Sequence, residues 1–257
     1  MAVNKLYAVC LAIAAASLTT SANAVPTQII VRVIAKNAKL VGDPAGGASV
    51  ILRDTETGVV LASGKTTGGS GDTQKLVGVP LVGGAPFAQP GDAAFSATID
   101  LAAPRRITVE AGSPGLGAYG GSSVSQTQWV LPGKSPHGPD GWLVELPGFM
   151  VDFLKPARHA TAPAKPVTVP IEANIVLMCG CPIGAGELWN SDKYQIDYTV
   201  TRAGQPFASG PLRFTGVADR FKGQFVANSS GVYAITVTAF DPATGNAGVA
   251  ETTFEVE

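Results

Sequence analysis

The segment "SGVYAITVTAFDPATGNAG", Ser230 to Gly248, decides the fold class of this 257-residue chain. From residue 234 its side chains alternate in character, with Ile235 and Val237 separated by Thr236. Residues two apart point to the same side of a strand, so this alternation predicts a strand with one buried face. The stretch "DPATGN" that follows is rich in residues that favour turns. The segment therefore predicts two consecutive strands joined by a turn.

Similar short apolar stretches, separated by turn residues, recur along the whole chain. Glycine and proline are frequent, at 31 and 19 residues, and no window has the apolar spacing of a long helix. We therefore expect an all-β protein with little helix. The strand candidates lie at residues 27–38, 48–54, 59–66, 93–101, 105–112, 122–133, 141–154, 169–178, 193–204, 210–231, 232–246 and 247–257.

A segment rich in proline and alanine divides these strands into two groups. Residues 155–169, within "KPARHATAPAKPVTVP", contain no large apolar residue before Val167, which is typical of an exposed linker. We expect one β-sandwich at residues 25–154 and a second at residues 170–257. Each sandwich then has about the 100 residues that such domains need.

The N-terminus has the order of a secretory signal peptide. One lysine precedes an apolar run from Leu6 to Leu18, and the small residues Ala22 and Ala24 follow. This order predicts cleavage after Ala24, hence a signal peptide at residues 1–24 and a periplasmic or secreted mature protein. No later segment is long and apolar enough to predict a transmembrane helix. The formal net charge of −1, with 14% charged residues, argues against a nucleic-acid partner.

Two stretches resemble known domain families. The stretch "GASVILRDTETGVVLASGKTTGGSG", residues 47–71, resembles the start of transthyretin-like and carboxypeptidase-regulatory-like domains. Residues 230–248, quoted above, are similar to bacterial immunoglobulin-like domains. This similarity implies that Tyr233 lies at the corner between two strands. Together the resemblances imply a transthyretin-like sandwich followed by an immunoglobulin-like sandwich. The signature tetrapeptide of the hydrolase among transthyretin-like proteins is absent, so the resemblance implies no hydrolase activity.

Residues for catalysis are few, and we expect no enzyme. The two histidines, His137 and His159, lie in a loop and in the predicted linker, and neither is near a nucleophile motif. Asp140, Glu187 and Asp192 lie in predicted turns, where acidic side chains usually bind nearby backbone N–H groups.

The stretch "MCGCP", residues 178–182, carries the most distinctive chemistry of the chain. Cys179 and Cys181 are the only cysteines left after signal cleavage, and Gly180 between them relaxes the backbone. In an oxidising compartment they form a local disulfide that shapes the following loop. In the alternative, they bind copper as Cu(I), with Met178 or Met150 as a thioether partner. In a third interpretation they are small buried apolar residues without chemistry.

The glycine-rich loops next to this stretch hold Trp189 and Trp142. Exposed tryptophans on loops at the end of a sandwich are a frequent means of binding a ligand, whereas buried ones plug the sandwich ends. We therefore expect an exported, non-catalytic binding or accessory protein that contacts its ligand through the Cys179–Trp189 loop and Trp142 and needs no cofactor. Its partner is a small molecule, a glycan or a protein. The alternative is a periplasmic Cu(I)-binding protein that uses Cys179, Cys181 and Met178.

Overall fold

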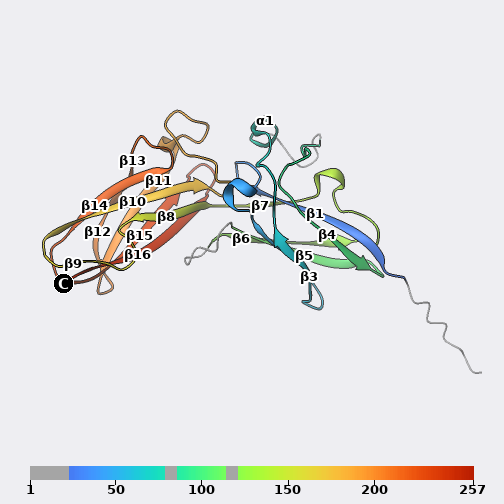
Figure 1. The fold of residues 1–257 in the computed structure, drawn as a ribbon, viewed down its shortest axis with the longest axis horizontal. Coiled ribbons are helices and arrows are strands. Elements are labelled where there is room, and N and C mark those ends of the chain that lie inside the picture. The colour runs from blue at the N-terminus through green and yellow to red at the C-terminus, as the bar shows by residue number, and fades with distance from the viewer. Residues whose placement is uncertain (1–22, 79–85, 114–120) are drawn as a thin grey trace, which may run out of the picture.

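The computed structural model describes residues 23–78, 86–113 and 121–257, and β-strands dominate these residues. Figure 1 shows two groups of strands placed end to end, with β1 to β7 in one group and β8 to β16 in the other. The predicted all-β class is confirmed. The predicted signal peptide lies outside the described residues, apart from Asn23 and Ala24. Within the described part of the chain, no helix has the length and hydropathy to span a membrane.

The first sandwich is built from two sheets whose inner faces share a hydrophobic core. Three strands form one sheet in the order β4-β1-β7, in which β1 and β7 run parallel, and four form the other in the order β3-β2-β5-β6. These strands are β1 (Val25–Ala35), β2 (Ser49–Asp54), β3 (Val60–Lys65), β4 (Phe95–Leu101), β5 (Arg105–Gly112), β6 (Ser123–Val130) and β7 (Trp142–Leu146). Short helices occur at α1 (Thr73–Leu76) and in the 3-10 turns Asp43–Ala45 and Gly138–Asp140.

Strand β1 is buried on both faces from Val31 onward, although its sequence alternates between apolar and polar residues. Arg32 is 8% exposed, and its guanidinium donates hydrogen bonds to the backbone oxygens of Asp92, Ala93 and Asp140 at 2.8 to 3.0 Å. These three carbonyls compensate for the loss of water around the buried charge. The loops that carry them are thereby fixed over the outer face of the sheet.

The second sandwich contains nine strands in two sheets. One sheet has the order β13-β14-β10-β8 and the other has the order β12-β11-β15-β16-β9. Its elements are β8 (Phe149–Lys155), β9 (Ala160–Ala162), β10 (Val167–Leu177), β11 (Gln195–Arg202), β12 (Gln205–Pro211), β13 (Arg213–Phe214), β14 (Arg220–Ala227), β15 (Gly231–Phe240), β16 (Ala247–Val256) and the 3-10 turn Ser191–Lys193. Residues 230–248, the segment that predicts the fold class, form β15, the following turn and the start of β16. The two strands pair antiparallel.

Tyr233 occupies the corner position that the resemblance implies. The side chain is fully buried, and its hydroxyl donates to the backbone oxygen of Ser229 at 2.7 Å. The same hydroxyl accepts the backbone N–H of Ser229 at 3.2 Å. The ring lies edge-on to Phe207, with the ring centroids 4.9 Å apart. This hydrogen bond to the backbone four residues earlier, together with the aromatic packing, fixes the turn that leads into β15.

The boundary between the sandwiches lies near Gly148, not near Leu154 as the proline-rich segment suggests. Strand β8 pairs with β10 in the second sandwich, and Phe149 is buried there against Tyr194. The predicted linker, residues 155–169, also belongs to the second sandwich, because it contains β9, which pairs with β16, and the start of β10. The sequence of a strand indicates that one face is buried but does not identify the sheet that it joins.

Asp54, at the end of β2, holds the turn to β3. One carboxylate oxygen accepts the backbone N–H groups of Glu56 and Thr57 at 3.0 and 2.9 Å, and the other accepts from Arg105 at 2.5 Å. The hydrogen bond from the Thr57 backbone, followed by that from Arg105, lowers the pKa of Asp54 from 3.8 to about 2. The folded state therefore favours the charged carboxylate.

We predict that the stabilising effect of Asp54 disappears in acid. Its folded pKa lies below the unfolded value, so its contribution is complete above pH 3.8 and is lost as the pH falls toward 2. Urea unfolding at a series of pH values, for the wild type and Asp54→Asn, measures this effect. The stability difference between the two proteins should shrink between about pH 5 and pH 2. A constant difference over that range would contradict the assigned hydrogen bonds.

Candidate functional site

The loop between β10 and β11, residues 178–190, lies at the end of the second sandwich that faces the first. Backbone hydrogen bonds give the loop a closed shape, including Gly184 N–H to Trp189 O at 3.1 Å and Ser191 N–H to Gly184 O at 3.1 Å. Asp219 accepts the backbone N–H of Ile183 at 2.6 Å through its side chain. The loop is therefore held to the neighbouring strands by its backbone, while its tip, residues 185–188, is exposed.

Cys179 and Cys181 lie within this closed shape, with their sulfur atoms at disulfide distance. Their Cα atoms are 5.2 Å apart, inside the usual range for a disulfide, and the two residues are 1% and 6% exposed. Gly180 adopts a left-handed backbone conformation, with φ of 71°, which brings the Cα atoms closer than a regular strand does. A Cβ added at Gly180 would contact Ala45 of the first sandwich at 3.4 Å, so the pair lies against that sandwich.

The copper alternative needs both sulfurs as free thiolates. Met178 is 2% exposed and Met150 is half-buried on β8. Among the described residues, no group of three or more His, Cys, Asp or Glu side chains lies in a position to hold a metal ion. Two sulfurs that are bonded to each other offer no thiolate to Cu(I). Copper binding by Cys179, Cys181 and Met178 therefore stays a prediction for the reduced protein.

Trp189 is buried, which corrects the prediction that it presents an exposed contact surface. The side chain is 8% exposed, and its indole N–H donates to the backbone oxygen of Asn37 at 3.2 Å. Asn37 belongs to the turn that follows β1, so this hydrogen bond joins the two sandwiches. The indole cannot stack on a ligand unless the sandwiches separate.

Trp142 is also buried and is not a surface for a ligand. It begins β7, is 2% exposed, and its indole N–H donates to the side-chain oxygen of Gln126 on β6 at 3.0 Å. The side chain connects the edges of the two sheets of the first sandwich. Both indoles are thus buried, as in the alternative that the sequence left open, with Trp189 at the end of the second sandwich and Trp142 between the sheet edges of the first.

The turn after β1, residues 36–38, is held from two sides by the second sandwich. Besides Trp189, the side chain of Asn246 donates to the backbone oxygen of Lys36 at 3.1 Å. The side-chain oxygen of Asn246 accepts the backbone N–H of Gly148 at 3.0 Å, and Asn246 is 1% exposed. One hydrophobic cluster runs through both sandwiches and includes Ala38 and Trp189. The Cys179–Trp189 loop and Asn246 therefore clamp the first sandwich to the second.

The two histidines lie far apart in the fold. His137 contacts Gln128 at 2.9 Å and His159 contacts Thr253 at 3.0 Å, on different sandwiches. Within the described residues, no carboxylate hydrogen-bonds to either imidazole. Asp140 accepts the backbone N–H groups of Phe87 and Ala88 through its side chain, the local role that the sequence suggested.

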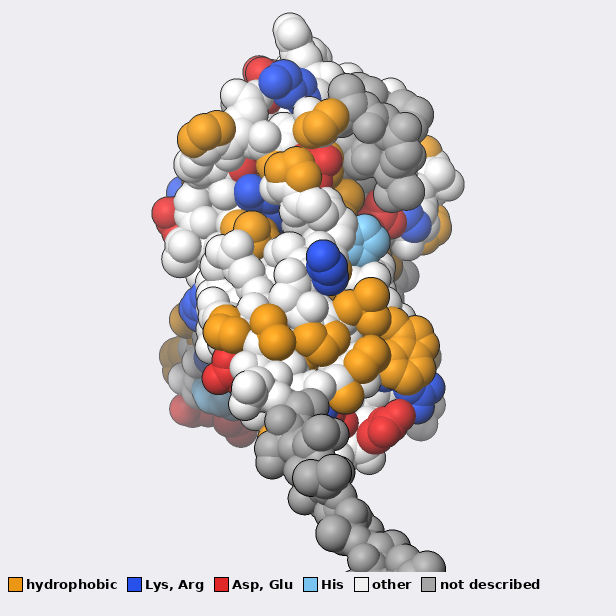
Figure 2. Space-filling model, turned by 90° about the vertical axis from the view of Figure 1, so that its right-hand side faces the viewer, with side chains coloured by type: hydrophobic (Ala, Val, Ile, Leu, Met, Phe, Trp, Pro, Cys, Tyr) orange, Lys and Arg blue, Asp and Glu red, His pale blue; other side chains and the backbone are white. Residues whose placement is uncertain are grey.

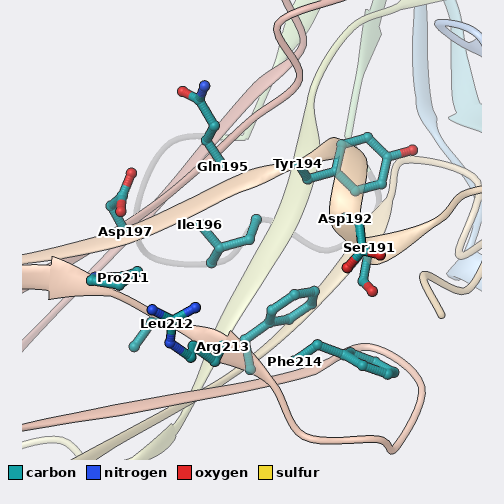
Figure 3. Close-up of a pocket in the computed structure, with 11 residues that line it drawn as sticks. Ser191, Asp192, Tyr194, Gln195, Ile196, Asp197, Pro211, Leu212, Arg213 and Phe214 are labelled. Carbon is teal, nitrogen blue, oxygen red and sulfur yellow. The ribbon is translucent and has the colours of Figure 1, made fainter. Parts of the chain in front are cut away.

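An open pocket of about 310 Å³ lies beside the loop, between the start of β11 and the strands β12 and β13. Figure 3 shows Ser191 and Asp192 at one end of this pocket and Asp197 and Pro211 at the other. The two carboxylates are therefore not paired for acid-base chemistry. Ser191 is 5% exposed, and its hydroxyl has no hydrogen-bond partner among the residues that the structure describes. Desolvation, followed by the charge of Asp241, raises the pKa of Tyr194 to about 12. The phenol of Tyr194 therefore stays protonated at neutral pH.

Comparisons with known proteins add little to this description. No protein-family model and no curated protein sequence matches the chain. An engineered protein is 14% identical with a TM-score of 0.32, over 46% of this chain, which spans only 22% of that protein. Fibronectin(III)-like modules of Clostridium thermocellum CbhA are 16% identical over 84% of this chain and 88% of theirs, with a TM-score of 0.29. The chicken interferon gamma receptor alpha chain is 9% identical over 82% and 84%, with a TM-score of 0.30. The transthyretin-like assignment of the first sandwich is not confirmed by these matches.

We predict that the native, unreduced mature protein has no titratable thiol. The purified protein is denatured without reductant so that buried thiols become accessible to a thiol reagent. The reagent should detect no thiol before reduction and two after it, because Cys179 and Cys181 form a disulfide. Two free thiols without reductant would contradict the disulfide. If that protein also retained Cu(I) against a chromophoric chelator, the copper alternative would replace it.

We predict that Trp189→Ala destabilises the protein by about 3–5 kcal/mol, the usual cost of removing a buried indole. Trp189→Phe keeps a ring but removes the hydrogen bond to Asn37, so it should cost less, because only one hydrogen bond and part of the ring volume are lost. Urea unfolding measures both. Leu188→Ala, at an exposed neighbour in the same loop, is the matched control and should change stability by less than about 0.5 kcal/mol. Equal stability of wild type and Trp189→Ala would show that the indole is not packed at this interface.

Proposed function

We propose that the chain is an exported, non-catalytic binding or accessory protein in which the two sandwiches act as one rigid support. The proposal rests on the position of the Cys179–Trp189 loop between the two sandwiches. The residues with the most distinctive chemistry of the chain are buried between the sandwiches, where they hold the turn at residues 36–38. Their role is to fix the relative orientation of the sandwiches.

A rigid support suits a protein that presents a surface to a partner. Mobile sandwiches lose orientational freedom on binding, whereas sandwiches that are already fixed lose less. The common hydrophobic cluster and the hydrogen bonds of Trp189 and Asn246 supply this fixation before any partner binds. The proposed ligand contacts lie on exposed faces of the sandwiches, away from the buried loop.

The proposed export rests on the N-terminal sequence and is consistent with a disulfide at Cys179 and Cys181. Small local disulfides persist in a periplasm or outside the cell, whereas cytoplasmic thiols are kept reduced. Removal of residues 1–24 would leave a mature chain that starts at Val25, the first residue of β1.

Expression of the full chain in a bacterial host, followed by fractionation and N-terminal sequencing, tests this proposal. We expect the protein in the periplasm or the medium with Val25 as its first residue. A variant with Ala22→Arg and Ala24→Arg, which blocks the cleavage motif, should accumulate as the longer precursor. Retention of the wild type in the cytoplasm with an intact N-terminus would contradict the proposed function.

A further inference from the structure

One tryptophan of the described chain is exposed, and it lies on neither of the loops that the sequence favoured. Trp129, on β6, is 60% exposed, whereas Trp142 and Trp189 are 2% and 8% exposed. An indole buries 150–250 Å² when it is covered, so its exposure to water forgoes a substantial hydrophobic gain. An exposed aromatic side chain that belongs to a larger apolar patch is a candidate binding surface.

The sheet β3-β2-β5-β6 places ordered polar groups beside this indole. Thr127 lies two residues before Trp129 on the same face, opposite Thr108 on β5. The hydroxyls of Thr55, Thr108 and Thr127 form a row, with oxygen–oxygen distances of 2.9 and 2.8 Å. This row presents hydroxyls that are held in place by hydrogen bonds to one another.

The charged residues near Trp129 on this face form ion pairs. Arg53 binds both carboxylate oxygens of Glu110, at 2.8 and 3.2 Å. Arg106, which lies opposite Trp129 in the register, is 3.6 Å from a carboxylate oxygen of Glu56. Each of these guanidinium groups already has a carboxylate, and among the described residues of this face Lys65, at its other end, is the remaining cation. One such charge is far less than a nucleic acid or another polyanion requires.

Apolar groups continue from Trp129 around the end of the sandwich. Figure 2 shows a band of hydrophobic side chains across this end of the molecule. Exposed residues at this end include Val25 at the start of β1, Leu131 just after β6, and the turn of residues 102–104 between β4 and β5. Along the chain, Trp129 lies between Thr127 of the hydroxyl row and the exposed Leu131.

We infer that this face binds a neutral saccharide chain, with the indole of Trp129 stacked on the C–H face of a sugar ring. This inference rests on the proposed function, since it names the ligand class of the binding protein. A pyranose ring has an apolar face and a rim of hydroxyls and carries no charge, which matches an indole, a hydroxyl row and internally paired ions. The paired guanidinium and carboxylate of Arg53 and Glu110 offer donors and acceptors to vicinal hydroxyls.

Fluorescence titration and isothermal calorimetry of the mature protein with neutral oligosaccharides test this inference. The probes are hexamers of β-1,4-linked glucose, β-1,4-linked N-acetylglucosamine, β-1,4-linked xylose and α-1,4-linked glucose, with heparin and anionic lipid vesicles as charged comparators. We expect at least one neutral hexamer to bind. Trp129→Ala should weaken it about tenfold or more, by analogy with the loss of other aromatic stacking contacts.

Matched variants separate the roles of the residues. Thr127→Val removes one hydroxyl of the row and should weaken the same hexamer several-fold, while Phe240→Ala, at a 40% exposed ring on the other sandwich, should leave binding unchanged. The urea midpoint of each variant checks that it is folded. Because Trp129 is exposed, Trp129→Ala should leave this midpoint nearly unchanged. Absence of binding by every neutral hexamer, binding of heparin or vesicles only, or equal binding by Trp129→Ala would overturn the inference. Correct export with cleavage at Ala24 would leave the proposed function standing in each of these cases.

Discussion

Two backbone carbonyls at the end of β1, those of Lys36 and Asn37, determine how the two halves of the molecule are joined. Each carbonyl accepts a hydrogen bond from a buried side chain of the second sandwich, Asn246 on one side and Trp189 on the other. Both hydrogen bonds are partly buried, because Asn37 is exposed and Lys36 is half-buried, and each such bond contributes about 0.5–1.5 kcal/mol to stability. The fold of the Cys179–Trp189 loop brings the indole into position for one of them. Its backbone closes on itself, its cysteines lie at disulfide distance against Ala45, and its indole reaches the turn.

The fold class follows from local sequence, because the period of two in segments such as "AITVT" is a property of single strands. The pairing partner of each strand does not follow from local sequence. Strand β8 has the same alternation whichever sheet it joins, so the boundary near Gly148 depends on the burial of Phe149 against Tyr194, a contact between residues 45 positions apart. The proline-rich segment suggested a linker because its apolar residues are small, yet the short β9 needs only backbone pairing with β16.

The residue types of the Cys179–Trp189 loop indicate its chemistry, but they do not indicate whether its side chains are exposed. The amino-acid sequence around Trp189 does not distinguish an indole that faces water from one that faces another domain, because a glycine-rich loop is compatible with both environments. The sequence around Asn246 predicts a turn residue, whereas its second role in the interface depends on the distant Lys36. Trp129 lies within an unremarkable alternating strand, and only the parity of β6, with Val130 buried, identifies its outward direction. As a result, the buried indoles hold the structure together, and the exposed one is available to a ligand.

The central claim is that the two sandwiches form one rigid body through the interface at residues 36–38. Residual dipolar couplings of backbone amides, measured separately for the β1–β7 and β8–β16 strands in a weakly aligned sample, test it most directly. If the interface holds, the two sets of couplings fit a single alignment tensor of one magnitude and orientation, with the strands oriented as in Figure 1. Two tensors of different magnitude would mean that the sandwiches move independently and would contradict the account.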